Sequence, residues 1–283
     1  MSPSEGMPRR RRGSSRVETD DGQAPGPGSA NGTRASSAPL LTVEQVGFAY
    51  PDGLRAIDSV SFQIRQGEIV SIIGPSGCGK STLLRLLAGL SVPTAGRIDR
   101  RLTDENRHPC TMVFQEETLL PWLKVKDNAG LHFRFKRDRS RENREHVERL
   151  LKMVGLQDFG DYYPAKLSGG MKRRVAVLTA VAPLPEMLLL DEPTRIGVHR
   201  DIYKLIREFG ISTTLVTHDL AEAITLSDRV LLLSRAPARI VGEYTVPFGE
   251  ERNILDLRGT SEFLDLYGKI WSDLEVQIKA TQE

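Results

Sequence analysis

A nine-residue glycine-rich segment constrains the fold of this chain more than any other feature. It fits the pattern G-x-x-x-x-G-K-[ST] and reads Gly74-Pro75-Ser76-Gly77-Cys78-Gly79-Lys80-Ser81-Thr82. A nearly all-apolar run at 69–73 precedes it, and helically spaced apolar residues follow at 81–90. We therefore expect a buried strand, a phosphate-binding loop and a helix. Glycines let backbone N–H groups face phosphate oxygens, Lys80 reaches the outer phosphates, and the Ser81 hydroxyl is a ligand for Mg²⁺.

Apolar patterns elsewhere indicate an α/β fold with a largely parallel sheet. Strand patterns occupy residues 41–50, 60–64, 187–190, 214–217 and 230–233. The last three are candidates for strands buried on both faces, because 187–190 and 230–233 are continuous apolar runs and 214–217 holds Leu-Val between two threonines. Helical patterns separate these strands, as parallel strand connections require, and residues 124–160 are charged and mostly helical in pattern.

Both ends of the chain differ from its centre. Residues 1–39 are rich in Pro, Gly and Ser and nearly lack large apolar side chains, so we expect a disordered tail. Its four consecutive arginines at 9–12 suit acidic lipid headgroups or nucleic acid, or belong to a solvated tail. Residues 246–283 form a predicted C-terminal extension whose amphipathic helix, at about 260–279, either packs on the core or presents a partner surface.

Charge and cysteine content exclude several classes of protein. The chain has 39 Lys and Arg against 37 Asp and Glu, a formal net charge of +2, which argues against a dedicated nucleic-acid binder. No apolar run approaches the ~18 residues that a membrane span needs, and no signal peptide is recognised. Two lone cysteines, Cys78 and Cys110, fit a reducing cytosol. We expect a cytoplasmic protein that is able to dock on membrane proteins.

Two carboxylates follow the apolar run at 187–190. Asp191 and Glu192 would stand at the carboxyl end of a buried strand, where open α/β sheets bind ligands. We expect Asp191 to hold Mg²⁺ through water and Glu192 to accept a proton from an attacking water as a general base. An acidic pair at a strand end is common by itself, and the phosphate loop gives this pair its catalytic interpretation.

Four further motifs, in a fixed order, resemble those of the ABC ATPases. Residues 167–171, Leu-Ser-Gly-Gly-Met, are similar to the signature sequence LSGGQ of that family. Gln115 resembles the Q-loop glutamine and His218 the switch histidine. Tyr50 resembles the aromatic residue that stacks on adenine, with packing in the core as its alternative role. Together with the two nucleotide motifs, these matches cover residues 41–235.

The resemblance implies an α/β, ABC-type P-loop NTPase cassette with a mixed sheet core. The ATPase domain would span residues 40–245 and include a helical signature subdomain at about 116–175. Two cassettes, in a homodimer or an equivalent pair, would hold ATP and Mg²⁺ between the phosphate loop of one and the signature of the other. Such a sandwich puts the backbone N–H groups of the signature residues against the γ-phosphate of the partner's nucleotide. Those residues are Ser168, Gly169 and Gly170.

The resemblance also assigns roles to the other motif residues. Gln115 would sense Mg²⁺ and the attacking water and relay closure to a membrane partner. His218 would hold the γ-phosphate and position Glu192. The implied metal ligands are Ser81, Gln115 and Asp191.

One branch of the family is the most similar. Leu119-Leu120-Pro121-Trp122 after the Q-loop, together with Met171 at the end of the signature, looks like importers of nitrate, sulfonate and taurine. The resemblance implies a peripheral subunit at the cytoplasmic face of the membrane. Multi-span permease subunits and an external solute-binding protein would be its partners, and no nucleic acid is expected. A soluble ABC protein acting on ribosomes or DNA is one alternative, and an exporter ATPase, which shares the core motifs, is another.

The chain departs from the family pattern at two places. Where the family has a D-loop such as Ser-Ala-Leu-Asp, this chain continues with residues 195–200, Arg-Ile-Gly-Val-His-Arg, and only 27 positions separate Asp191 from His218. After the signature, Arg173 replaces the usual Gln, and Leu178-Thr179 replaces Ala-Arg. Two interpretations follow from the short loop: an active ATPase, or a cassette that binds ATP with weak hydrolysis.

Overall fold

The computed structural model describes residues 38–101, 107–115, 119–192, 199–250 and 252–279. Its strands are β1 (Leu41–Ala49), β2 (Arg55–Ile64), β3 (Ile69–Ile73), β4 (Ala95–Arg100), β5 (His108–Val113), β6 (Pro185–Asp191), β7 (Ser212–Val216), β8 (Arg229–Leu233) and β9 (Ile240–Thr245). Its α-helices are α1 (Lys80–Leu87), α2 (Val125–Ala129), α3 (Leu131–Phe135), α4 (Arg141–Met153), α5 (Gly169–Val181), α6 (His199–Glu208), α7 (Leu220–Leu226), α8 (Ile254–Leu257) and α9 (Ser261–Lys279). Short 3₁₀ turns lie at Gln157–Phe159 and Pro164–Lys166.

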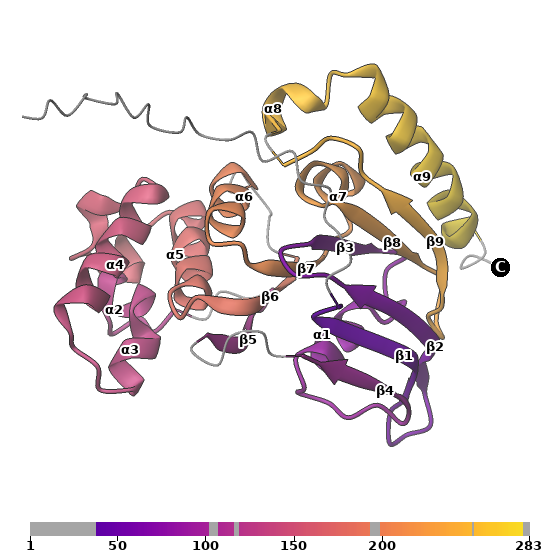
Figure 1. The fold of residues 1–283 in the computed structure, drawn as a ribbon, viewed down its shortest axis with the longest axis horizontal. Helices are drawn as coiled ribbons and strands as arrows, with labels where there is room; N and C mark the ends of the chain where they lie inside the picture. The colour runs from indigo at the N-terminus through magenta and orange to yellow at the C-terminus, as the bar shows by residue number, and fades with distance from the viewer. Residues whose placement is uncertain (1–37, 102–106, 116–118, 193–198, 251, 280–283) are drawn as a thin grey trace, which may run out of the picture. The chain divides into compact units, whose positions relative to one another are not determined.

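A six-stranded sheet forms the centre of the fold (Figure 1), with the strand order β5-β6-β7-β3-β8-β9. All neighbouring strands pair in parallel except β8 and β9, which are antiparallel. Every residue of β3, β6 and β7 is buried, as expected for strands covered on both faces. The predicted α/β fold with a mixed sheet is confirmed.

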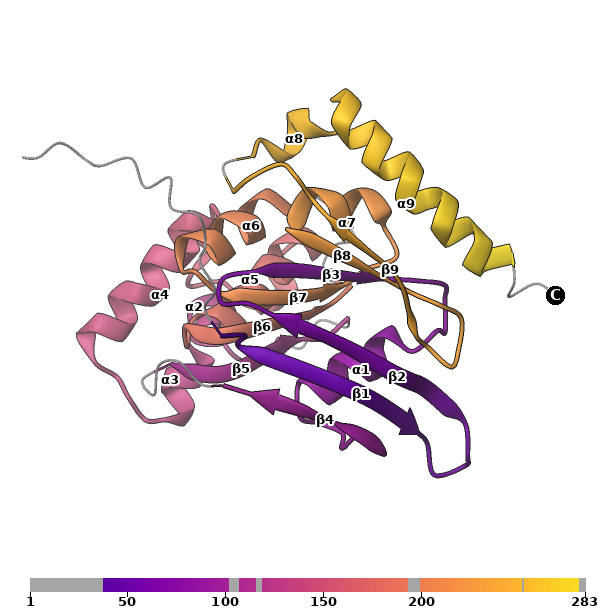
Figure 2. The ribbon, with the colours of Figure 1, turned by 45° about the vertical axis from the view of Figure 1, so that its right-hand side comes forward.

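A second, antiparallel sheet has the order β2-β1-β4. Helix α1 lies between the two sheets (Figure 2), with contacts to β2 on one side and to β6 and β7 on the other. Leu83, Leu84 and Leu87 of this helix are fully buried in the cluster that both sheets share. The helix that follows the phosphate loop is therefore fixed from two sides.

Two predicted boundaries were wrong for identifiable physical reasons. Strand β2 begins at Arg55 instead of residue 60, because Ser59 has a positive φ of 58° and the pairing with β1 shifts register there. Such a bulge hides the alternation that a sequence pattern needs. Helix α1 ends at Leu87 instead of residue 90, because Gly89 adopts a φ of 72° and stops the helix.

Helices α2, α3, α4 and α5 follow one another along the predicted helical region and pack together beside β5 and β6 (Figure 1). The apolar stripe predicted on α4 is buried and consists of Val147, Leu150, Leu151 and the adjoining Val154. At the other end of the chain, α9 packs against α7 and buries Phe263, Ile270 and Leu274, which confirms core packing for this amphipathic helix. Among the described residues, no helix has the length and apolar character to span a membrane.

Candidate nucleotide-binding and catalytic site

Five predicted parts of the site lie at the carboxyl ends of four neighbouring strands: the phosphate loop, Gln115, Asp191, Glu192 and His218. The phosphate loop follows β3, Asp191 ends β6 with Glu192 next to it, His218 comes shortly after β7, and Gln115 follows β5. Because the strand order is β5-β6-β7-β3 and all pairs are parallel, these ends meet at one edge of the sheet. A cavity of about 650 Å³ opens there. Nine predicted residues line it: Tyr50, Ser76, Gly77, Gly79, Lys80, Ser81, Thr82, Glu192 and His218.

The phosphate loop has a backbone that needs glycine. Gly77 and Gly79 have φ values of 75° and 111°, which side-chain-bearing residues rarely adopt. A Cβ on Gly79 would also lie 2.9 Å from the carbonyl oxygen of Ala56, whereas a Cβ on Gly77 meets nothing within 4 Å. Gly77 thus faces open space on the cavity side, where a ligand can approach the backbone.

Two loop residues, Lys80 and Cys78, make contacts inside the phosphate loop. The ammonium of Lys80 is held by its own loop: Nζ donates to the carbonyl oxygens of Gly74 at 2.9 Å and Pro75 at 2.8 Å. Cys78 is 1% exposed, and burial raises the pKa of its thiol, so it stays protonated at neutral pH and serves as a packing residue. These contacts fix the loop from inside and leave its outer surface to the cavity.

The start of α1 is suited to a phosphate group. Gly79 is its N-cap and provides no side-chain hydrogen bond to the first turn. The first N–H groups of a helix have no partner within the helix, and the helix dipole makes that end positive. Lys80, Ser81 and Thr82 carry these N–H groups and line the cavity. The residues present therefore fit the di- or triphosphate of a nucleotide.

The pair Ser81 and Asp191 fits a magnesium ion. The Ser81 hydroxyl donates to Asp191 Oδ1 at 3.0 Å, so a hydroxyl and a carboxylate oxygen stand side by side next to the phosphate loop. Burial raises the pKa of Asp191, and the neighbouring Glu192 raises it further, while the Ser81 hydrogen bond opposes the shift. No group of three or more His, Cys, Asp or Glu side chains arranged for a metal occurs in the described residues. Mg²⁺ commonly takes one or two carboxylates and completes its shell with phosphate and water.

Glu192 is the centre of a polar cluster. Gln115 Nε2 donates to Glu192 Oε2 at 3.0 Å, and His218 Nδ1 lies 3.3 Å from Glu192 Oε1. The Glu192 side chain is 25% exposed, which leaves it accessible to water. Glutamine and histidine thus hold one carboxylate oxygen each, and this arrangement orients the predicted general base.

Tyr50 closes the cavity at the second sheet. Its hydroxyl forms a 2.7 Å hydrogen bond with Thr82 Oγ1, and its ring meets Phe48 edge to face. The ring is 37% exposed, so one part packs and another part faces the cavity. Four lining residues were missed by sequence reasoning, because they belong to no motif: Leu54, Arg55, Ala56 and Ala236.

The signature residues lie apart from the cavity, at the start of α5. Ser168 is the N-cap, and its Oγ accepts a hydrogen bond from the Met171 N–H at 3.3 Å. Ser168 and Gly169 are exposed and Gly170 is half-buried. None of the three lines the cavity with the phosphate loop. An exposed helix start can bind an anion that another molecule carries.

Three predicted features lie wholly or partly outside the described residues. They are the N-terminal tail, of which residues 1–37 are not described, the shortened D-loop, of which residues 193–198 are not described, and the segment at 116–118 that follows Gln115.

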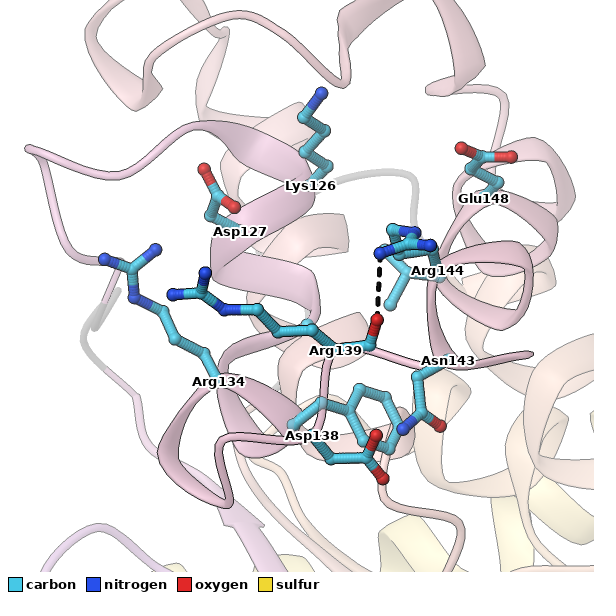
Figure 3. A pocket seen from close by; sticks show the side chains of 11 residues that line it. Lys126, Asp127, Arg134, Asp138, Arg139, Asn143, Arg144 and Glu148 are labelled. Atoms are coloured by element: carbon cyan, nitrogen blue, oxygen red, sulfur yellow. Dashed lines mark hydrogen bonds between the residues drawn. The ribbon is translucent and has the colours of Figure 1, made fainter. Parts of the chain in front are cut away.

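A second cavity, of about 410 Å³, lies among α2, α3 and α4 (Figure 3). Arg134, Arg139 and Arg144 line it, together with Asp127, Asp138 and Glu148, and Arg144 donates to the Arg139 carbonyl oxygen. Charges of both signs line this cavity, and none of the predicted site residues is among its lining residues.

Comparison with known proteins agrees with this geometry. The ABC transporter family matches residues 57–195. The taurine import ATP-binding protein TauB from Jannaschia sp. is 38% identical over 256 residues, which cover 83% of this chain and 94% of that protein. This chain belongs to the ABC transporter ATP-binding family.

Two further relatives are also named as import ATP-binding proteins. The nitrate import ATP-binding protein NrtC from Synechococcus elongatus is 40% identical over 237 residues, which cover 80% of this cassette but 36% of NrtC. The cassette therefore spans about a third of that relative. The aliphatic sulfonates import ATP-binding protein SsuB 1 from Pseudomonas aeruginosa is 40% identical over 229 residues, 76% of the cassette and 90% of SsuB 1.

A solved structure confirms the cassette fold. The dimeric structure of MJ0796, a bacterial ABC transporter cassette, has a TM-score of 0.63 at 31% identity and covers 73% of this chain and 99% of that one. A second MJ0796 dimer, in a post-hydrolysis state bound to ADP and Pi, gives a TM-score of 0.62. The predicted ABC-type ATPase fold and family are therefore confirmed, and the members of this family are ATPases.

Proposed function

We propose that this cassette binds ATP with Mg²⁺ and hydrolyses it as the energy-coupling subunit of an importer. One observation carries the proposal: the phosphate loop, Glu192 and His218 line a single cavity, although they come from segments far apart in the sequence. Phosphoryl transfer needs a cradle for phosphates, a cation and a group that orients water. The phosphate loop suits the first, Ser81 and Asp191 would hold the second, and Glu192 suits the third.

The geometry supports a distinct role for each residue. Lys80 and the α1 N-terminus bind the phosphates, and Ser81 and Asp191 hold Mg²⁺. Glu192, oriented by Gln115 and His218, accepts the proton of the attacking water. Tyr50 packs against the base of the nucleotide, and the exposed signature residues 168–170 complete the site of a second cassette.

The importer assignment rests on the relatives and on one exposed apolar segment. TauB, NrtC and SsuB 1 are named for taurine, nitrate and aliphatic sulfonates, which contain a small oxyanion group. Trp122 is 69% exposed directly after the Q-loop, and Phe135 at the end of α3 is 77% exposed. We propose that the surface of the helical region that carries these exposed side chains binds a multi-span permease at the cytoplasmic side of the membrane. The transporter would contain two cassettes.

Mg²⁺-dependent ATP hydrolysis by the purified chain tests the proposal. ATP binding is measured in parallel, and Glu192→Gln is the control variant. We expect turnover in the wild type and a loss of about 100-fold or more in Glu192→Gln with ATP binding retained, because the variant lacks the general base. Binding without turnover in the wild type, alone and with its permease, would favour a cassette with weak hydrolysis. Turnover unchanged in Glu192→Gln would exclude Glu192 as the base.

Purification of the tagged full chain from its native membrane tests the partner. We expect a multi-span permease to co-purify, and uptake of labelled taurine, nitrate or an alkanesulfonate to depend on the cassette. Co-purification with ribosomes instead would contradict the transport role. Uptake of none of the three solutes, with the permease present, would contradict the assigned substrate class.

A further inference from the structure

Arg173 connects parts of the site that the family motifs treat as separate. It lies on α5, shortly after the signature residues, and is 8% exposed. Its Nη1 donates to the carbonyl oxygens of Phe114 at 3.1 Å and Gln115 at 2.8 Å. Its Nη2 donates to the carbonyl oxygens of Glu192 at 2.7 Å and Asp191 at 3.4 Å. One guanidinium thus binds four backbone carbonyl groups that belong to two segments.

The two segments are the ends of neighbouring parallel strands. The β5–β6 ladder runs to the pair Val113 and Leu190, and the four acceptors follow directly after it. The planar guanidinium fork presents several donors in fixed directions, so it suits carbonyl groups that diverge from a ladder. Arg173 therefore continues the joint between these strands beyond the last pair, from a helix that begins at the signature.

The backbone of Glu192 needs this support. Its φ is 48°, in the left-handed region, which is strained for a residue other than glycine unless the surrounding structure holds it there. The Glu192 N–H donates to the Val216 carbonyl oxygen at 2.8 Å, and Arg173 binds the Glu192 carbonyl group. Both sides of the strained residue are thereby fixed, and the carboxylate points toward Gln115 and His218.

We propose that Arg173 is a positioning residue for ATP hydrolysis, which acts by fixing the backbone of Gln115 and Glu192 to the signature helix. It holds the general base and its glutamine partner in one geometry, and it transmits displacement of α5 to both. The inference deepens the proposed function and rests on it. A lysine cannot take its place, since a single ammonium cannot span four acceptors in two segments.

Three variants of the full chain test the inference: Arg173→Met, Arg173→Lys and Arg174→Gln. Arg174 is the matched control, because it is the next arginine on α5 and instead pairs with Asp201 on α6, Nε to Oδ2 at 3.0 Å. ATP turnover at saturating ATP, ATP affinity and melting temperature are measured for each. We expect turnover to fall about 10- to 100-fold in Arg173→Met and in Arg173→Lys, because small displacements of catalytic groups have effects of this size. ATP affinity stays within about threefold of the wild type, since the phosphate loop is untouched, and Arg174→Gln keeps its turnover.

Hydrogen exchange supplies a readout that does not depend on activity. The Glu192 amide is bonded to Val216, so its exchange reports how firmly this backbone is held. We expect faster exchange in peptides covering 185–192 in Arg173→Met and unchanged exchange in Arg174→Gln.

Several outcomes would overturn the proposal. The first is a folded Arg173→Met whose turnover and hydrogen exchange equal those of the wild type. The second is full turnover in Arg173→Lys. The third is a parallel fall of ATP affinity, turnover and melting temperature in both Arg173 variants, because that pattern indicates a structural role alone. Absence of turnover in the wild type would instead contradict the proposed function, and the exchange comparison still decides whether Arg173 holds the Glu192 backbone.

Discussion

The side-chain amide of Gln115 donates to Glu192 Oε2 at 3.0 Å across 77 positions of sequence. The contact exists because β5 and β6 pair in parallel, so the residues that follow them leave the sheet side by side. The donated N–H therefore holds one oxygen of the Glu192 carboxylate in a fixed direction. This contact links Gln115 to turnover, because Glu192 is the proposed general base.

Gln115→Glu is expected to shift the acid limb of the pH–rate profile to higher pH. The substitution replaces a hydrogen-bond donor with a second carboxylate next to Glu192, and like charges raise the pKa at which both become ionised. We expect a shift of about one pH unit or more in turnover at saturating ATP. Gln115→Met removes the donor without adding charge, so a smaller shift is expected in this control. An unshifted acid limb in Gln115→Glu would show that the two side chains do not meet in the working enzyme.

Several elements of the fold were predictable from sequence because their signals are local. The run at 69–73 is apolar except for Ser71, and it coincides with β3, which is buried on both faces. Strands β4 and β5 were not predicted, each for a different reason. Residues 95–100, in β4, are mostly exposed and carry charges, whereas β5 contains Pro109 and lies at the edge of its sheet, where proline is tolerated.

The site shows the same division between local and non-local information. Motifs located the phosphate loop and the carboxylates, but the contact between Gln115 and Glu192 depends on strand order, which no motif encodes. The departures after the signature were visible in the sequence without an explanation. In the structure Arg173 binds two strand ends, and Thr179 Oγ1 donates to the Asn128 carbonyl oxygen at 2.9 Å, joining α5 to α2.

Lys80→Ala is expected to lower ATP affinity by about 100-fold or more, because it removes a cation that makes charge-assisted contacts with phosphate. Lys80 is 8% exposed and held by two loop carbonyl groups, so the substitution removes the charge from inside the loop. Titration with a fluorescent ATP analogue measures the effect. Arg85→Ala, which removes an exposed cation from the same helix, is the control and should bind normally. Retained affinity in Lys80→Ala would contradict the assignment of the nucleotide site.

Ser81→Ala is expected to raise the Mg²⁺ concentration needed for half-maximal turnover by about tenfold, since a ligand is lost and the remaining carboxylate is harder to ionise. Burial already raises the pKa of Asp191, and the Ser81 hydroxyl opposes that rise. As the pH falls, activation by Mg²⁺ should therefore be lost at a higher pH in this variant than in the wild type. Thr82→Val provides the comparison, because the Thr82 hydroxyl bonds Tyr50 and its removal should leave the Mg²⁺ requirement unchanged. Equal Mg²⁺ curves for wild type and Ser81→Ala would place the cation elsewhere.

Glu222→Gln is expected to increase the free energy of unfolding, relative to the wild type, more at pH 8 than at pH 5. The pKa of Glu222 is raised from 4.5 to about 7. Burial is the main cause and Asp219 and Glu192 act in the same direction, while the Thr217 hydrogen bond and Arg258 oppose the rise. Because the folded pKa is above the unfolded one, this group's contribution to stability is complete below pH 4.5 and is lost as pH rises through 7.

The variant stays neutral throughout, so its stability gain over the wild type should grow by up to about 3 kcal/mol between pH 5 and 8. Urea unfolding at several pH values measures this difference in the free energy of unfolding. A gain that is independent of pH would show that Glu222 is already ionised in the fold at pH 5.

Asn128→Ala is expected to destabilise the protein by about 2–4 kcal/mol, because buried backbone groups lose their partners. Asn128 is 1% exposed; its Oδ1 accepts from the Leu120 N–H, and its Nδ2 donates to the carbonyl groups of Leu120, Leu123 and Lys124. These bonds shape the turn that presents Trp122, whose side chain is 69% exposed.

Trp122→Ala should therefore leave the free energy of unfolding unchanged and reduce permease recovery in co-purification. Permease recovery at the wild-type level in a folded Trp122→Ala would remove this turn from the docking surface.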